Sequence, residues 1–352
     1  MIKVGEDREI KFDKSLRYAR QKDYNIKDYE SVPFEFFTGP RNVYKNFNFS
    51  IFTDDYCNAD CKFCVAQLRY QHKSLMYQKE HICDPDEYLK RLDEVLKLVR
   101  PLNPSISITG GEPTLCKYLV EILQLIDKYD FRKRTITTNG SGLFIPQGNS
   151  LIIENLEKYK VDHLNISRAH FDEKRNQDIM RYNDLKHYCG LGMLRDILDY
   201  TNTHRISHRM SCLLLKEGIN SVEMIKQYVE HLQKLGANNF IFRELMDYDK
   251  TAINTEKMKY CNDNKIKLNE IWEDFEKYPE FIPYLNIVGY YYYVEIYKYL
   301  NTTVASESAD LNQQYVEKAA HPDMVYEMVF HNNGNLCGSW IDKEDILDPY
   351  KK

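Results

Sequence analysis

Residues 57–64 read CNADCKFC and contain three of the nine cysteines in this 352-residue chain. Cys57, Cys61 and Cys64 follow one another at C-x3-C-x2-C spacing. Three thiolates at this spacing can bind three irons of a cubane [4Fe-4S] cluster and leave the fourth iron without a protein ligand. The alternative is a closed tetrahedral zinc site, in which His72 or His81 joins the three cysteines.

A second stretch, Gly110-Gly111-Glu112-Pro113, follows a short run that is predicted as a strand at 105–109. Because glycine has no Cβ, two glycines in succession let the backbone come close to a ligand. A bare GGEP sequence is a common turn, but its position after the second predicted strand makes it a specific signal.

Together with an aromatic residue, Phe63, just before the last cysteine, these motifs resemble those of the radical S-adenosylmethionine (radical SAM) superfamily. The resemblance extends from about Phe47 to Leu245 and is greatest to the MoaA-like group of single-chain maturation and biosynthetic enzymes. It implies that SAM chelates the open iron through its amino and carboxylate groups. It also implies that the reduced cluster cleaves SAM to methionine and a 5′-deoxyadenosyl radical, which starts the chemistry by hydrogen abstraction.

Strand patterns alternate with helical patterns in the middle of the chain, and six strands are expected at 47–52, 105–109, 134–138, 161–167, 208–215 and 239–243. One helix is expected to begin at the N-cap Asp84 before Pro85, and another at a capping box of Asn220 and Glu223. This alternation requires a parallel sheet with right-handed crossovers. The resemblance narrows it to an open, partial (β/α)6 TIM-like barrel, whereas periodicity alone also allows a doubly wound sheet. In both folds the site lies at the carboxyl ends of the strands.

Three regions are expected: an N-terminal extension at 1–45, the radical SAM core barrel at 46–250, and an α+β C-terminal capping or substrate region at 251–352. The extension is too short for the winged-helix leader-binding domain of many peptide-modifying radical SAM enzymes. The last region is expected to close the open side or the mouth of the barrel. Its predicted elements are a helix at 257–277, an aromatic helix or strand pair at 284–300, and a hairpin at 324–340 that turns at Asn332-Asn333-Gly334.

The net charge of −5, from 48 basic and 53 acidic residues, indicates neither a nucleic-acid-binding surface nor a strongly anionic tail. The most apolar late segment, 284–299, is interrupted by charged residues and falls short of a membrane span. Residues 1–6 lack the apolar core of a secretory signal, so nine cysteines indicate a reducing cytoplasm. The expected partners are a small-molecule substrate and a reducing protein such as flavodoxin or ferredoxin, with no nucleic acid and no membrane.

The resemblance also implies which residues contact SAM. Ser167 and Arg168 are our choice for its carboxylate, because a guanidinium binds a carboxylate bidentately. Phe63 is expected beside the adenine or, alternatively, in the core, and a turn at 138–140 is the structural alternative to a SAM contact. The full set of candidate SAM-binding residues is Phe63, Gly110, Gly111, Glu112, Pro113, Thr138, Asn139, Asn165, Ser167, Arg168 and Arg209.

Four residues are candidates for catalysis or substrate contact. Arg243 and Glu244 place opposite charges at the end of a buried strand, which is costly unless they pair or bind something. His170 follows the fourth strand and faces either the substrate or the surface. Cys337 follows the hairpin turn and could donate a hydrogen atom, although most lone cysteines are small buried hydrophobes.

Six cysteines stand alone in the sequence, so one cluster is predicted and the C-terminal cluster of the molybdenum-cofactor member is not. The GTP substrate of that member is therefore not carried over. The first functional hypothesis is a radical SAM enzyme that acts on a nucleotide, sugar or amino-acid derivative. The second is a peptide-modifying maturase of the RiPP type, and the third is a zinc-stabilised binding module without turnover.

Overall fold

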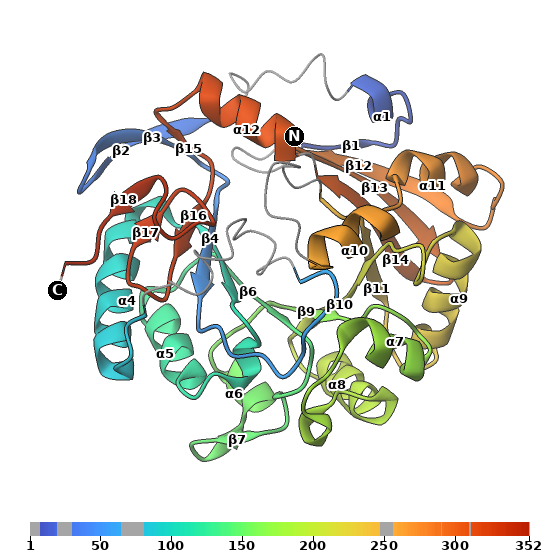
Figure 1. The fold of residues 1–352 in the computed structure, drawn as a ribbon, viewed down its shortest axis with the longest axis horizontal. Helices are drawn as coiled ribbons and strands as arrows, with labels where there is room; N and C mark the ends of the chain where they lie inside the picture. Colours follow the sequence, from blue (N-terminus) through green and yellow to red (C-terminus); the bar gives the residue numbers. More distant parts are fainter. Residues whose placement is uncertain are drawn as a thin grey trace.

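The computed structural model describes residues 8–19, 30–64, 81–246, 256–289, 291–309 and 311–351. Its centre is a curved sheet with helices around the outside (Figure 1). Six strands pair in parallel in the order of the chain: β4 (Asn48–Phe52), β5 (Ser105–Thr109), β6 (Lys133–Thr138), β9 (His163–Ser167), β10 (Ser207–Leu213) and β11 (Asn239–Arg243). The order never reverses, which rules out the doubly wound alternative. The sheet does not close on itself, so the partial (β/α)6 barrel is confirmed.

The helices between these strands are α4 (Pro85–Val99), α5 (Leu119–Tyr129), α6 (Ile152–Lys158), α7 (Glu173–Met180), α8 (Leu191–Thr203) and α9 (Val222–Gln233). Asp84 caps α4 as predicted, because its carboxylate accepts a hydrogen bond from the backbone of Asp86. The predicted start of α9 is wrong by one residue. Ser221, rather than Asn220, is the N-cap and accepts from the backbone of Met224, while Asn220 donates to the carbonyl of Lys216.

Successive residues of each strand face opposite sides of the sheet. In β5, Ile106 and Ile108 are fully buried in the core shared with α4 and α5. Ser105, Ser107 and Thr109 point the other way and are half-buried. The face away from the helices, called the inner face below, is therefore polar along β4 to β10.

Both edges of the parallel sheet are extended by later parts of the chain. Beyond β11 lie β14 (Thr302–Ala309), which is parallel to it, then β13 (Tyr292–Tyr299) and β12 (Ile282–Val288). Beyond β4 lie β16 (Met328–Phe330), parallel to β4, then β17 (Leu336–Cys337) and β18 (Ile346–Asp348). The predicted hairpin at 324–340 is thus the shorter pair β16–β17. Of the two readings of 284–300, the strand pair is confirmed.

The predicted single helix at 257–277 is wrong, because the chain forms α10 (Glu256–Asn264) and α11 (Leu268–Phe275) with a break between them. Lys265 in that break bridges to Leu215 beyond β10. The remaining elements are β1 (Arg8–Lys11), α1 (Leu16–Ala19), β2 (Ser31–Phe36), β3 (Gly39–Tyr44), β7 (Pro146–Gln147), β8 (Ser150–Leu151), α12 (Leu311–Ala320) and β15 (Met324–Val325). None of the helices in the described ranges is long and apolar enough to cross a membrane.

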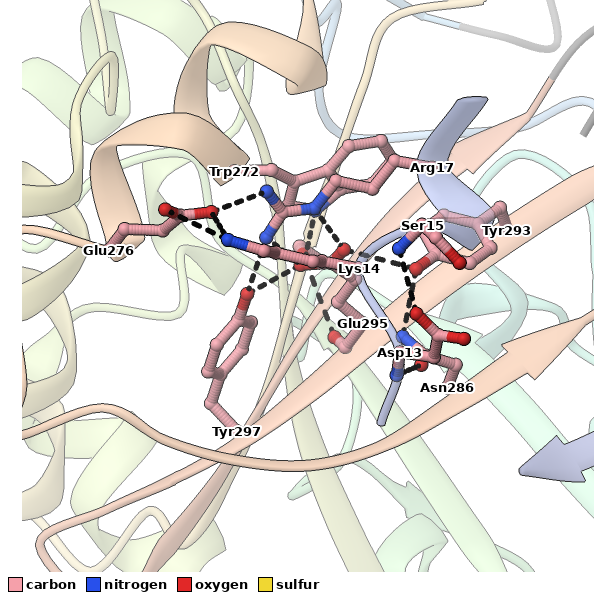
Figure 2. A network of polar contacts seen from close by, with 11 residues as sticks. Asp13, Lys14, Ser15, Arg17, Trp272, Glu276, Asn286, Tyr293, Glu295 and Tyr297 are labelled. Atoms are coloured by element: carbon pink, nitrogen blue, oxygen red, sulfur yellow. Dashed lines mark hydrogen bonds and ion pairs between the residues drawn. The ribbon is translucent and has the colours of Figure 1, made fainter. Parts of the chain in front are cut away.

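The N-terminal segment is fastened to the far edge of the sheet through a buried ion pair (Figure 2). Strand β1 pairs antiparallel with β12. Arg17 then contacts both carboxylate oxygens of Glu295, with Nε at 2.5 Å and Nη2 at 3.0 Å. The hydroxyls of Tyr293 and Tyr297 donate to the same carboxylate. A buried charge pair is stable only with such complete hydrogen bonding, so this network fixes residues 13–17 against β13.

We expect Arg17→Met to destabilise the protein by about 3–5 kcal/mol, because it leaves the Glu295 carboxylate buried and unpaired. The double variant Arg17→Met/Glu295→Met should recover much of this loss, since no charge then stays buried. Urea unfolding measures the difference. Lys14→Met is the control, because the Lys14–Glu276 pair is exposed. Equal effects of Arg17→Met and Lys14→Met would contradict the prediction.

Candidate functional site: the cysteine loop and the strand ends

The loop of residues 57–64 begins a few residues beyond β4, at the carboxyl end of the parallel strands. Backbone hydrogen bonds fasten it to the segment 179–183 at the end of α7: Asp60 to Arg181 (3.0 Å), Lys62 to Ile179 (3.1 Å) and Asn183 to Asn58 (2.8 Å). A further bond within the loop, from the amide of Cys64 to the carbonyl of Cys61, closes a tight turn. The three cysteines are therefore held on a defined backbone.

The three cysteine residues are partly buried, and their thiols are close enough for their charges to interact. Burial raises the pKa of Cys57 to about 12. Burial, and then the neighbouring charges of Cys64 and Cys57, raise the pKa of Cys61 well above its ordinary value. Thiolates in such a place need positive charge beside them, which cluster irons supply. The donor set thus fits an iron–sulfur cluster.

The zinc alternative needed a histidine next to the cysteines. Nδ1 of His81 accepts a hydrogen bond from Asn332 at 2.7 Å, and its Nε2 lies 3.3 Å from the carboxylate of Asp55. Both ring nitrogens are thus engaged elsewhere, and His72 lies outside the described residues. Among the residues that the structure describes, no three His, Cys, Asp or Glu side chains are arranged as ligands of one ion. A cubane cluster does not require that arrangement, because each cysteine binds a different iron.

The two glycines of the GGEP segment allow the chain to pack against its own backbone. A Cβ on Gly111 would lie 2.1 Å from the carbonyl oxygen of Tyr56, and one on Gly110 would lie 2.8 Å from that of Asp54. The amides of Gly111 and Glu112 donate to the carbonyls of Asp54 and Tyr56, both at 2.7 Å. The glycines therefore fix the entry to the cysteine loop, in addition to the close approach of a ligand that the sequence predicts for them.

Glu112 is a buried carboxylate with four hydrogen-bond donors, and it joins the ends of β5 and β6. Its Oε1 accepts from the amide of Thr114 at 3.1 Å, from the hydroxyl of Thr114 at 2.6 Å and from the hydroxyl of Thr138. Its Oε2 accepts from the amide of Asn139 at 2.7 Å. Burial raises the pKa of this carboxyl group. Pro113, also buried, begins a 3-10 helix at Pro113–Leu115.

A closed ring of hydrogen bonds connects the end of β6 to the cysteine loop. The side chain of Asn139 donates to Asn58, that of Asn58 donates to Ser141, and the amide of Ser141 donates back to Asn139, each at 2.9 Å. Asn58 is 2% exposed although it stands between two cysteines. Asn58 and Ser141 are not among the site residues predicted from the sequence. An asparagine directly after the first cysteine was the available signal.

Arg168 follows β9 and is 97% buried. Its Nη1 donates to the carbonyl of Cys189 at 3.3 Å, whereas Nε and Nη2 have no partner among the described residues. A buried guanidinium with unused donors is costly unless an anion binds it. Ser167 lies half-buried one residue earlier, on the inner face of β9.

The candidate residues His170, Arg243 and Glu244 lie at or just beyond the ends of β9 and β11. His170 is 2% exposed, so the surface alternative is wrong. Its Nδ1 accepts from the amide of Asp172, its Nε2 has no partner in the described ranges, and burial lowers its pKa to about 4. Arg243 and Glu244 do not pair with each other: Arg243 lies 3.5 Å from Glu307, and Glu244 lies 3.8 Å from Lys265.

Cys337 is fully buried in β17, where its thiol donates to the carbonyl of Asp342, so its position does not favour hydrogen donation to a substrate. Phe63 packs against a small core cluster that includes Leu215 and Met258.

Lys257 of α10 is a residue of the site that the sequence does not predict. It donates to the carboxylate of Asp60 and to the carbonyl of Cys61, both at 2.6 Å, and thereby ties α10 to the cysteine loop.

An open parallel α/β barrel with a three-cysteine loop at its carboxyl-end mouth defines the class of protein. Residues 52–204, which include the three cysteines and the GGEP segment, match the family model of the radical SAM superfamily.

Individual relatives are more distant. A probable GTP 3′,8-cyclase from Thermoplasma volcanium is 34% identical over 95 residues, which is 27% of this chain and 27% of that protein. A GTP 3′,8-cyclase from Marinobacter nauticus is 26% identical over 147 residues, 40% of this chain and 39% of that protein. The solved structure of Streptococcus suis SuiB bound to the precursor peptide SuiA covers 92% of this chain and 64% of its own, with a TM-score of 0.53 and 17% identity. The chain thus spans less than two thirds of the length of each of these proteins.

We expect Gly111→Ala to lower the iron and sulfide content of reconstituted protein at least severalfold, because its Cβ would collide with the backbone of Tyr56. Gly192→Ala in α8 is the control, since nothing lies within 4 Å of a Cβ there. Iron and sulfide analysis after anaerobic reconstitution measures the effect. Full cluster content in Gly111→Ala would show that this close approach does not position the cysteines.

Proposed function

We propose that this protein is a radical SAM enzyme with a [4Fe-4S] cluster and SAM as its cofactors. It would cleave SAM reductively to a 5′-deoxyadenosyl radical, which abstracts hydrogen from a small-molecule substrate such as a nucleotide, sugar or amino-acid derivative. The observation that carries the proposal is the attachment of the three-cysteine loop to the ends of β5 and β6 through Asn58, Asn139 and Glu112. The cluster, when bound, supplies the electron for SAM cleavage, and the protein holds the reacting groups in place and excludes water.

The residues of this chain have separate tasks in that reaction. Cys57, Cys61 and Cys64 would hold the cluster, and the backbone at Gly110–Glu112 would face the SAM amino group. Arg168 would bind the SAM carboxylate through the two nitrogens that have no partner among the described residues. Glu112 is 2% exposed and its carboxylate already accepts four hydrogen bonds from this chain, so we infer that it orders the strand ends and does not itself contact SAM.

The first test is anaerobic reconstitution with iron and sulfide, followed by dithionite and SAM, with detection of 5′-deoxyadenosine by chromatography and mass spectrometry. Wild-type protein should form 5′-deoxyadenosine, and Cys61→Ala should form none because it lacks a cluster ligand. Cys83→Ala is the matched control, since Cys83 is an exposed free thiol outside the three-cysteine motif. A wild-type protein that binds iron but never cleaves SAM would overturn the proposed function.

The SAM contact of Arg168 is tested separately. Arg168→Met should raise the Kd for SAM about tenfold or more, because a charge-assisted bidentate contact is lost. Arg175→Met, on the exposed face of α7, should bind SAM like the wild type. Equilibrium binding to the reconstituted proteins measures both. Equal affinities of the two variants would remove Arg168 from the SAM site.

A peptide substrate is the second candidate, supported by the fold similarity to SuiB, which was solved with a precursor peptide bound.

GTP, which the names of the cyclase relatives give as their substrate, is one of several substrates to test and is not preferred here, for two reasons. The match to them covers less than half of this chain, and the later cysteines, Cys261 and Cys337, are both buried in separate elements. Stimulation of 5′-deoxyadenosine formation by individual nucleotides, including GTP, or by peptides would discriminate between the two classes.

The setting of the reaction is also part of the proposal. The nine cysteines are free thiols, which supports a reducing compartment such as the cytoplasm. The electron would come from a reducing protein such as a flavodoxin or ferredoxin.

The boundaries at residues 45 and 250 separate regions that we propose differ in role. They do not separate independent sheets, since the same sheet runs through all three regions.

A further inference from the structure

A row of polar side chains crosses three neighbouring strands on the inner face of the sheet. Thr137, Asn165 and Arg209 stand directly opposite one another on β6, β9 and β10. Asn165 donates to the hydroxyl of Thr137 at 3.5 Å and accepts from Nε of Arg209 at 3.0 Å. Because Nε is engaged in this way, the two terminal nitrogens of Arg209 are the ones left to bind a ligand.

Arg209 has no acidic partner of its own among the described residues. With the described part of the chain it forms one hydrogen bond, to the neutral amide of Asn165. Burial, and then the nearby charge of Arg243, lower the pKa of Arg209 to about 10, against an opposing effect of Glu307. His163, two residues before Asn165 on the same face, is kept neutral because burial lowers its pKa to about 3.

The second arginine lies at the rim of the same face. Arg243 ends β11, and its Nε is 3.5 Å from the carboxylate of Glu307 on the neighbouring strand β14. Its side chain is 35% exposed and that of Glu307 is 24% exposed. Among the residues that the structure describes, two guanidinium groups therefore face the interior beside the carboxylate of Glu307, which leaves an excess of positive charge on this part of the inner face.

We propose that Arg209, aided by Arg243, binds an anionic group of the substrate, a carboxylate or a phosphate, on the inner face of the barrel. The inference rests on the proposed function, because it names the class of molecule on which the radical would act. Arg209 stands four residues before the end of β10, about 13 Å below the strand end at the usual rise. It therefore lies deeper than Arg168, which follows β9 at the mouth and is assigned to SAM. A fork of two terminal nitrogens suits either oxyanion.

The test is calorimetric titration of the reconstituted protein with inorganic phosphate and, separately, with succinate, at constant ionic strength. Wild-type protein should bind at least one of them saturably, and the better ligand identifies the anionic group. Arg209→Met should weaken that binding about tenfold or more. Arg205→Met, an exposed arginine just before β10, is the matched control and should bind like the wild type. Arg209→Lys keeps the charge without the fork and should bind with intermediate affinity.

Saturating SAM should leave this binding unchanged if the two sites are separate. Three results would overturn the proposal: no saturable binding of either anion, equal binding by Arg209→Met and Arg205→Met, or competition between SAM and the anion. Formation of 5′-deoxyadenosine by the wild type is measured in parallel. Anion binding without SAM cleavage would refute the proposed function and leave the anion site in place, whereas cleavage without anion binding would refute only the anion site.

Discussion

The buried carboxylate of Glu112 is the interaction on which the site depends. Removing a carboxylate from water is expensive, and four donors on this chain offset that cost with hydrogen bonds worth about 1.5–3 kcal/mol each when one partner is charged. Two of the donors belong to the end of β6 and two to the turn after β5. The backbone amide of Asn139 donates to Glu112, and the side chain of Asn139 donates to Asn58. The hydrogen bonds of Glu112 are therefore connected to those of the cysteine loop.

Later parts of the chain complete the surroundings of the site, and the N-terminal segment packs against them. The C-terminal strand β16 lies beside β4 and brings Asn332 to His81 and Asp55, just before the cysteine loop. Strand β14 lies beside β11 and brings Glu307 to Arg243. The ion pair of Arg17 and Glu295 then holds the N-terminal segment against the outer strands on that side. Residues far apart in sequence thus determine the surroundings of a core barrel that is itself local in sequence.

Much of the fold was predictable, because the six parallel strands have strong periodic patterns and alternate with helical patterns. The start of α9 was predicted one residue early, since Asn220 and Ser221 are both good N-caps and only packing decides between them. The break at 265–267 was not predictable, because it depends on a bridge to Leu215. The three cluster cysteines and the GGEP segment could be identified from the spacing of their residues in the sequence. Asn58, Ser141 and Lys257 could not, since their roles arise from contacts between segments that no local pattern records.

The ring formed by Asn58, Asn139 and Ser141 consists only of amide, hydroxyl and backbone groups. None of these groups gains or loses a proton in the ordinary range of pH, and none carries a net charge. A metal cluster that cycles between oxidation states changes the electric field around it with every electron. A neutral ring responds weakly to such a change, so the peptide that carries the cysteines can keep the same shape in both oxidation states. Little reorganisation energy would then be lost in the protein at each electron transfer.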